Sequence, residues 1–377
     1  MIYRNFQNIK LSSLGMGCMR LPVLEGNNSK IDMEAARKMI SFAMEKGVNY
    51  YDTAWGYHGG ESERAMGKLL KDYPRESFYL ASKFPGYDLS NMGKIKEIFE
   101  QQLERCQVEY FDFYLFHNVC ELNIEGYLDP DNGIMEYMLE QKRNGRIRHI
   151  GFSTHGTIET VTRFLDAYGE HMEFCQIQLN WLDYKMQNAK AKVELLREKN
   201  IPIWVMEPVR GGKLVNIEPE YEAELKKLRP EASVVEWAFR FLQSFPEVVV
   251  TLSGMSDMAQ LQSNVATYEC EKPLNELEMQ KLLDTALAMT AKTSLPCTAC
   301  RYCTDHCPTE LDIPRIIEIY NERAYSGGGF LTSMAVRALP EDKRPSACIG
   351  CRACEAVCPQ NIKISEMMSA FAQGLKK

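Results

Sequence analysis

Residues 50–83 read YYDTAWGYHGGESERAMGKLLKDYPRESFYLASK. An apolar run at Tyr50–Ala54 leads through a helical pattern at Ser62–Lys71 to a second apolar run at Phe78–Lys83. Strands that are apolar on both faces and joined by a helix are typical of a parallel sheet. The stretch therefore predicts one strand–helix–strand unit.

The same alternation continues from about residue 11 to residue 268. Eight strands are expected, at Leu11–Gly17, Tyr50–Ala54, Phe78–Lys83, Phe111–His117, Ile147–Ser153, Phe174–Leu179, Ile203–Glu207 and Val248–Gly254. Helical patterns lie between them, at Met33–Lys46, Ser62–Lys71, Lys94–Cys106, Met135–Arg143, Ile158–Tyr168, Ala189–Lys199, Val234–Ser244 and Met258–Tyr268. Eight such units in roughly 260 residues predict an α/β fold of the (β/α)8 TIM-barrel type, whose functional side chains gather at the C-terminal ends of the strands.

Composition excludes several classes of protein. Of the 377 residues, 45% are hydrophobic and 25% are charged, which is ordinary for a globular chain. The net charge of −7 argues against a nucleic-acid partner. No stretch approaches the ~18 apolar residues of a membrane span, and residues 1–8 hold no apolar signal-peptide core. We therefore expect a cytoplasmic protein with no membrane partner.

Cysteine is concentrated near the C-terminus, where eight of the 13 lie in two similar runs. The runs are Cys297-x2-Cys300-x2-Cys303-x3-Cys307-Pro308 and Cys348-x2-Cys351-x2-Cys354-x3-Cys358-Pro359. This is the spacing of bacterial two-cluster ferredoxins, in which the fourth cysteine of each run binds the other cluster. The spacing predicts two [4Fe-4S] clusters, one on Cys297, Cys300, Cys303 and Cys358 and one on Cys348, Cys351, Cys354 and Cys307. Two structural zinc sites are the alternative, because sets of four cysteines also bind zinc.

A domain boundary is expected near residue 290. The last helical pattern, Glu276–Met289, is followed by Ser294-Leu295-Pro296 and then by the cysteine runs. We expect a barrel over residues 1–290 and a small α-helical, ferredoxin-like domain over residues 291–377.

Four chemically active side chains follow three successive strands of the predicted barrel. They are Asp52, Tyr57, Lys83 and His117. A buried Lys needs a charged partner, and Asp52 is placed to provide it. A Tyr beside that Lys would have its pKa lowered from about 10, so that it could give a proton to a carbonyl oxygen. Taken singly, a His at a strand end or an Asp after a strand is more often structural.

These residues resemble the catalytic tetrad of the aldo-keto reductase family. The resemblance covers about residues 1–290 and extends to Ile147-Arg148-His149-Ile150-Gly151-Phe152-Ser153, Gln176-x3-Asn180, Pro208-x2-Gly211-Gly212 and Ser253-Gly254-Met255 leading to Asn264. With its C-terminal cysteines, the whole chain resembles the subgroup that carries a 4Fe-4S ferredoxin-like domain. The resemblance implies an oxidoreductase that reduces a small carbonyl compound, or oxidises an alcohol, with NAD(P)H.

The resemblance also implies a role for each matching residue. Tyr57 would be the general acid, Lys83 would lower its pKa, Asp52 would hold Lys83, and His117 would orient the substrate carbonyl. The cofactor contacts would be Ser153 and Gln176 at the nicotinamide, supported by Asn180; Met206 where the family often stacks an aromatic ring; Gly211, Gly212 and Lys213 at the pyrophosphate; and Ser253, Gly254, Met255 and Asn264 at the adenosine end. Trp55, Tyr87 and Trp181 are candidate walls of the substrate pocket.

Cofactor choice and the role of the clusters stay open on the sequence. Residues 254–260, GMSDMAQ, contain no Lys or Arg, so a 2′-phosphate there would lack a charge-assisted partner. Met206 in place of an aromatic ring leaves room for a flavin such as FMN. The clusters could be structural, sense redox state, or relay electrons to or from a redox partner protein. An electron carrier and a regulatory nucleotide-binding protein are alternatives, although neither needs Tyr57 and Lys83 together.

Overall fold

The computed structural model describes residues 1–375. The chain divides into two compact units, Met1–Leu282 and Leu283–Lys377. This division falls inside helix α12 (Glu276–Ala291), and the boundary expected from the sequence, after residue 290, lies at the end of the same helix.

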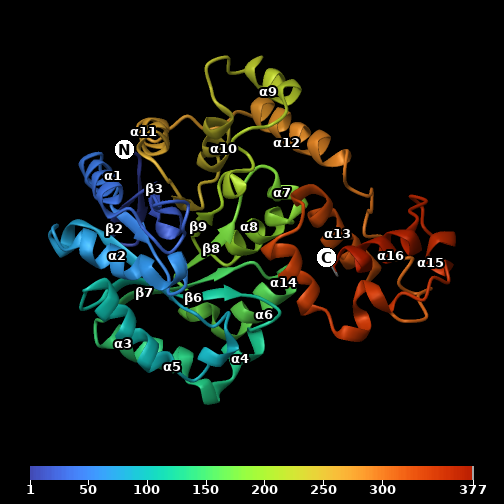
Figure 1. Ribbon diagram of the computed structural model, residues 1–377, viewed down its shortest axis with the longest axis horizontal. Helices are drawn as coiled ribbons and strands as arrows, with labels where there is room; N and C mark the ends of the chain where they lie inside the picture. The colour runs from blue at the N-terminus through green and yellow to red at the C-terminus, as the bar shows by residue number, and fades with distance from the viewer. Residues whose placement is uncertain (376–377) are drawn as a thin grey trace. The chain divides into compact units, whose positions relative to one another are not determined.

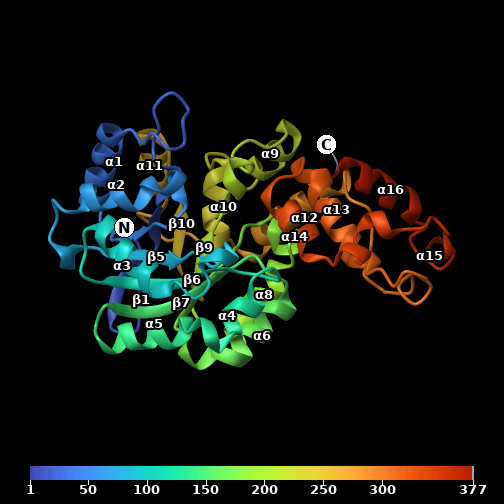
Figure 2. The same cartoon turned by 60° about the horizontal axis from the view of Figure 1, so that its bottom comes forward.

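The first unit is a closed barrel of eight parallel strands in the order β10-β3-β4-β5-β6-β7-β8-β9, enclosed by helices (Figures 1 and 2). The predicted (β/α)8 barrel is therefore confirmed. Its strands are β3 (Leu14–Gly17), β4 (Tyr50–Asp52), β5 (Tyr79–Phe84), β6 (Phe111–Val119), β7 (Ile147–Thr154), β8 (Phe174–Gln178), β9 (Ile203–Met206) and β10 (Val248–Ser253). Its helices are α1 (Met33–Glu45), α2 (Glu61–Leu70), α3 (Ile95–Cys106), α4 (Ile124–Leu128), α5 (Ile134–Arg143), α6 (Ile158–Tyr168), α7 (Asp183–Met186), α8 (Ala189–Glu198), α9 (Pro219–Lys226), α10 (Val234–Gln243) and α11 (Met258–Thr267).

The expected first strand, Leu11–Gly17, is wrong as a single element. Its first residues belong to β2 (Ile9–Ser12), which pairs antiparallel with β1 (Tyr3–Phe6), and the barrel strand β3 begins only at Leu14. The Ser12 hydroxyl donates to the Leu14 carbonyl at 2.7 Å and marks the turn between the two strands. The turn lies at Ser12-Ser13, with no Gly or Pro beside it, so the sequence predicts a single strand that includes Leu11 and Leu14 on either side.

The hairpin of β1 and β2 closes the end of the barrel at which the strands begin. The Phe6 ring lies 5.7 Å from Phe113, 6.4 Å from Phe174 and 5.0 Å from Trp204, measured between ring centroids. Phe174 is the first residue of β8 and Trp204 the second of β9. Because aromatic rings fill the amino-terminal end, the opposite, carboxyl-terminal end is left for function.

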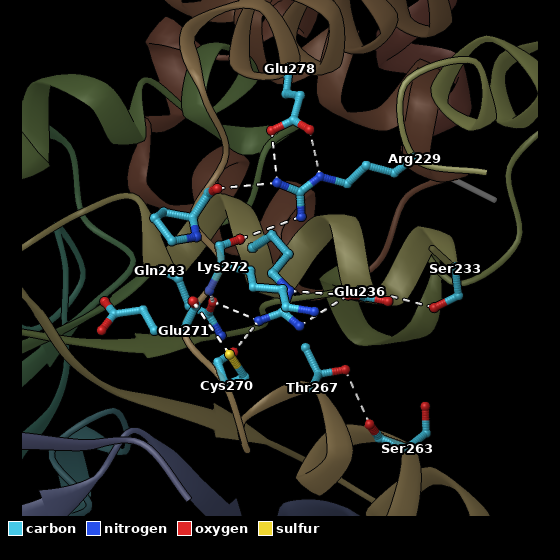
Figure 3. A network of polar contacts seen from close by, with 12 residues as sticks. Arg229, Ser233, Glu236, Gln243, Ser263, Thr267, Cys270, Glu271, Lys272 and Glu278 are labelled. Atoms are coloured by element: carbon cyan, nitrogen blue, oxygen red, sulfur yellow. Dashed lines mark hydrogen bonds and ion pairs between the residues drawn. The ribbon is translucent and has the colours of Figure 1, made fainter. Parts of the chain in front are cut away.

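A polar network fastens the segment after α11 to α10 (Figure 3). Arg229 makes a two-pronged contact with Glu278, at 2.7 and 2.8 Å, and donates to the Pro273 carbonyl at 3.1 Å. Arg240 of α10 donates to the Cys270 carbonyl and, at 2.9 Å, to the Gln243 side chain. The network lies within the first unit and fixes where α12 begins.

The second unit is built from short helices. They are α13 (Ile313–Ser326), α14 (Phe330–Ala338), α15 (Ala353–Ala356) and α16 (Ile364–Gly374). Its core contains Ile316, Ile317, Met368 and Phe371, with several cysteines packed against it. The expectation of a small helical C-terminal region is confirmed. Across residues 1–375, no helix combines the length and apolar character needed to span a bilayer.

Candidate active site and cluster sites

Lys83 is the centre of a buried polar group at the carboxyl end of the barrel. Its ammonium donates to Asp52 Oδ1 at 2.6 Å, to the Thr53 carbonyl at 2.8 Å and to the Tyr57 hydroxyl at 3.3 Å. Lys83 is fully buried and Asp52 is 2% exposed. Asp52 ends β4 and Lys83 is next to last in β5, so parallel neighbouring strands bring them to the same edge. The pairing expected from the sequence is present, and Thr53, which the sequence did not single out, is a third acceptor.

The electrostatics of Tyr57 differ from expectation. Burial raises the pKa of the Tyr57 hydroxyl above its usual value, and the charge on Lys83 opposes this without overcoming it. The expectation of a net lowering was wrong, because desolvation of the phenolate outweighs its attraction to the ammonium. Burial also raises the pKa of Asp52, again against Lys83, while Asp52 and Tyr57 outweigh burial and raise the pKa of Lys83.

His117 completes the group from β6. Its ring centroid lies 6.0 Å from that of Tyr57 and 5.1 Å from that of Tyr87, edge-on in both cases. Burial lowers the pKa of His117 well below its usual value, and the positive charge of Lys83 adds to this. The imidazole is therefore neutral near pH 7. Tyr127 donates to the His117 carbonyl at 2.7 Å and so fixes the backbone that carries the ring.

A second buried network, which the sequence analysis missed, braces the strand that carries Lys83. Glu63 Oε1 accepts from Ser82 at 2.7 Å and from Gln102 at 2.6 Å. Gln102 also donates to the Lys83 carbonyl at 3.0 Å and accepts from the Tyr114 hydroxyl at 2.6 Å. Glu63 follows Tyr57 closely in the sequence, but its partner Gln102, on α3, carried no pattern of its own.

The residues expected at a nicotinamide lie at or near the ends of β7, β8 and β9. Ser153 Oγ accepts from the Asn118 backbone N–H at 2.8 Å. Gln176 Nε2 lies 3.7 Å from the Met206 sulfur, and Gln176 Oε1 is buried with no hydrogen-bond partner among residues 1–375. Both ends of the Asn180 side-chain amide are hydrogen-bonded within the protein. Nδ2 donates to Asp183 and to the Glu207 carbonyl, and Oδ1 accepts from the backbone N–H groups of Leu182 and Asp183. It braces these loops and offers no group to a ligand.

The residues expected at the phosphates and adenosine follow β9 and β10. Gly211 and Gly212 have φ values of 64° and 96°, in the left-handed region that favours glycine, and Lys213 follows them on the surface. Asn264 donates to Ser253 Oγ at 3.1 Å, and Met255 is buried. Arg20, which the sequence analysis missed, lies against Gly211 and Gly254.

The three aromatic candidates for pocket walls have different surroundings. Tyr87 is 42% exposed and contacts His117 edge-on. Trp55 lies beneath the Arg105 guanidinium, 3.6 Å from the ring centroid. Trp181 is fully buried. Only Tyr87 therefore combines exposure with contact to the polar group.

The eight clustered cysteines line two cavities in the second unit. One cavity is lined by Cys307, Cys348, Cys351 and Cys354. The other is lined by Cys297, Cys300, Cys303 and Cys358. These are the two sets expected from the sequence, each with its fourth cysteine drawn from the other run.

The thiols of each set lie around a cavity and do not meet at one point. Among residues 1–375, no three His, Cys, Asp or Glu side chains converge closely enough to hold one metal ion. The thiols instead surround a cavity, as the corners of an iron–sulfur cube require. Backbone N–H groups also point at sulfur, from Ala299 to Cys297 and from Leu311 to Cys307, both at 3.4 Å.

Comparison with protein families decides the class of the first unit, since residues 13–285 match the aldo/keto reductase family model. The chain belongs to the aldo/keto reductase family. Residues 296–362 match the model of a 4Fe-4S dicluster domain. The chain is therefore an oxidoreductase of the aldo-keto reductase type with a 4Fe-4S domain, which confirms the resemblance seen in the sequence.

Individual relatives agree with this assignment. The chain is 26% identical to a probable aldo-keto reductase 1 of Glycine max, over 72% of this chain and 86% of that protein. It is 27% identical to an NADH-specific methylglyoxal reductase of Escherichia coli, over 55% of this chain and 66% of that protein. The holo form of aldo-keto reductase AKR11C1 from Bacillus halodurans superposes with a TM-score of 0.61 at 27% identity, over 76% of this chain and 96% of that one.

Proposed function

We propose that this aldo-keto reductase reduces a small carbonyl compound, or oxidises the corresponding alcohol, with a nicotinamide dinucleotide. The observation that carries the proposal is the Lys83 ammonium, which contacts both Asp52 and the Tyr57 hydroxyl beside the neutral ring of His117. This places a proton donor, a cation that stabilises its conjugate base, and a neutral hydrogen-bonding ring at one end of the barrel.

Each residue has a defined task in the proposed reduction. A bound nicotinamide supplies the hydride. Tyr57 holds the proton at its hydroxyl and gives it to the carbonyl oxygen, and Lys83 stabilises the phenolate that this leaves. Asp52 balances the charge of Lys83, so the ammonium stays ionised although it is buried. His117, being neutral, orients the carbonyl by a hydrogen bond and does not take part as an acid.

A nicotinamide fits the polar groups beside this cluster. Gln176 Oε1 is a buried acceptor with no partner among residues 1–375, and the carboxamide N–H of a nicotinamide is a matching donor. Ser153 would contact the same carboxamide through its hydroxyl. The Escherichia coli relative, named an NADH-specific methylglyoxal reductase, supports both a nicotinamide and a small carbonyl substrate.

We further propose that each cysteine-lined cavity holds one [4Fe-4S] cluster. The four thiols around each cavity supply one ligand for each iron of a cube. The N–H groups of Ala299 and Leu311 would then stabilise the negative charge of the ligand sulfurs.

The test uses the full chain, purified anaerobically. We expect it to oxidise NADH or NADPH in the presence of small aldehydes and ketones, methylglyoxal included, and we expect Tyr57→Phe to lose this activity while binding the dinucleotide as before. A flavin in the purified protein, or turnover that does not depend on Tyr57, would contradict the proposal.

A further inference from the structure

Arg20 lies at the carboxyl end of the first barrel strand, in the short helix η1 (Cys18–Arg20). β3 and β10 are neighbours in the closed barrel, so the loop that carries Arg20 meets the loop after β10. A Cβ placed on Gly254 would come within 3.0–3.1 Å of three carbons of the Arg20 stem, and one placed on Gly211 would come within 3.1 Å of Nη2. The stem thus lies over Gly254, and the guanidinium reaches the loop after β9.

The backbone around Arg20 is fixed by hydrogen bonds, but its guanidinium is not paired with any group of residues 1–375. Its carbonyl accepts from Ser256 Oγ at 3.1 Å, and the next N–H, that of Leu21, donates to His58 Nε2 at 3.1 Å. The side chain is exposed and makes no hydrogen bond or ion pair with any of residues 1–375. By contrast, the neighbouring Arg210 is buried and paired with Asp183 at 2.9 Å.

The surroundings of the guanidinium suit an anion. The acid in the loop after β10, Asp257, is already bonded to the backbone N–H and side chain of Gln260, both at 2.8 Å. A Cβ on Gly212, the residue after Gly211, would meet nothing within 4 Å, so the loop after β9 has open space next to the position that the guanidinium reaches. β9 and β10 are the seventh and eighth strands of this barrel, and the loops after those strands frequently form a phosphate site in TIM barrels.

We propose that Arg20 binds the pyrophosphate of the dinucleotide, an inference that rests on the proposed function. If the nicotinamide lies at Gln176, the middle of the dinucleotide passes between the loops after β9 and β10, which Arg20 bridges. A guanidinium can donate two parallel, charge-assisted hydrogen bonds to phosphate oxygens, in addition to any bonds from the backbone N–H groups of the glycine loop. Arg20 would thus add a cation from the loop after β3 to the pyrophosphate site between the loops after β9 and β10. Because the pyrophosphate is common to both dinucleotides, Arg20 strengthens the binding of NADH and NADPH alike.

Dissociation constants of NADH and NADPH, measured on the anaerobic full chain without substrate, test this proposal. Arg20→Gln is expected to raise both constants by a similar factor, about tenfold or more, and to flatten their dependence on salt. Arg20→Lys should restore part of the affinity. Arg143→Gln, which removes an equal charge from the exposed end of α5, should leave both constants unchanged.

A second variant reaches the same question without changing charge. The backbone of Gly254 is outside the left-handed region, so the Gly254→Ala variant should fold. Its new methyl group should displace the Arg20 stem and so weaken the binding of both dinucleotides. Unchanged constants in Arg20→Gln would overturn the proposal, and so would a loss confined to NADPH, which would place the guanidinium at the 2′-phosphate. A wild-type chain that binds neither dinucleotide would instead contradict the proposed function itself, and this inference with it.

Discussion

At the scale of single residues, the chemistry of the barrel depends on one ammonium shared among three oxygen atoms. Lys83 contacts a carboxylate, a backbone carbonyl and a phenol, and all four groups lie within a few residues of strand ends. Removing one partner from a buried ion pair costs about 3–5 kcal/mol, because it leaves an uncompensated charge. Asp52 and Lys83 are therefore structural as well as functional, and Tyr57 is the cleaner position to test.

Tyr57→Phe removes only the hydroxyl and is expected to lower kcat for carbonyl reduction about 10²–10⁴-fold, the usual contribution of a general acid. Dinucleotide affinity and thermal stability should not change. Steady-state kinetics with equilibrium binding on the same sample measures both. A variant with wild-type kcat would show that the phenol does not transfer the proton.

The pH dependence follows from the raised pKa of Tyr57. Carbonyl reduction needs the protonated phenol, so activity persists as pH rises and is lost only above the raised pKa, on the alkaline side of pH 10. The Lys83 charge holds this pKa down, so Lys83→Met is expected to shift the alkaline limb of kcat/KM to still higher pH. His117, with its pKa well below 6.5, adds no limb near neutrality. A limb between about pH 7 and 9 would show a phenol whose pKa is lowered in the free enzyme.

At the scale of the elements, polar networks set where the functional strands and helix α12 lie. Gln102 on α3 joins Glu63 on α2 to the backbone of β5, so the position of Lys83 depends on two helices outside the barrel. Arg229 and Glu278 fix the start of α12 in the same way, by an ion pair whose side chains are 19% and 10% exposed.

Arg229→Met is expected to lower the free energy of unfolding of the barrel unit by about 1–3 kcal/mol, since Glu278 and the Pro273 carbonyl lose a partly buried charged donor. Urea unfolding followed by circular dichroism measures the change. Arg143→Met, at an exposed position on α5, serves as the control and should unfold as the wild type does. Equal midpoints for the two variants would mean that the contact drawn in Figure 3 does not hold α12.

At the scale of the whole molecule, the two cysteine runs are expected to fold as one unit, because each cavity takes its fourth thiol from the other run. The anaerobic protein should contain about eight irons per chain. Zinc in place of iron would contradict the cluster assignment.

Paired substitutions test the exchange of the fourth ligand. Cys307→Ser combined with Cys348→Ser affects one cavity and should leave about four irons per chain. Cys307→Ser combined with Cys303→Ser affects both cavities and should leave almost none. If each run instead held its own cluster, the two results would be reversed, so iron analysis of the two double variants decides between the arrangements.

The sequence by itself determined the barrel, the helical C-terminal region and the grouping of the eight cysteines. These features depend on local order: apolar periodicity along each strand and helix, and fixed spacing within each cysteine run. The same dependence on local order explains the error at residues 11–17, because Ser12-Ser13 is a weaker turn signal than Gly or Pro and the break between β2 and β3 was missed. Asp52, Tyr57, Lys83 and His117 could be grouped because parallel strands end at a common edge.

Tertiary structure alone decided the features that depend on distance and solvent. Arg20 and Gln102 had no motif, and their roles appear only when Gly211, Gly254 and Glu63, remote in sequence, lie beside them. The direction of the Tyr57 pKa depends on how far water is excluded from the phenol as well as on its nearness to Lys83. A sequence gives the identity of a charge and its neighbours in the chain, but the balance between desolvation and Coulomb attraction exists only once the groups are packed together.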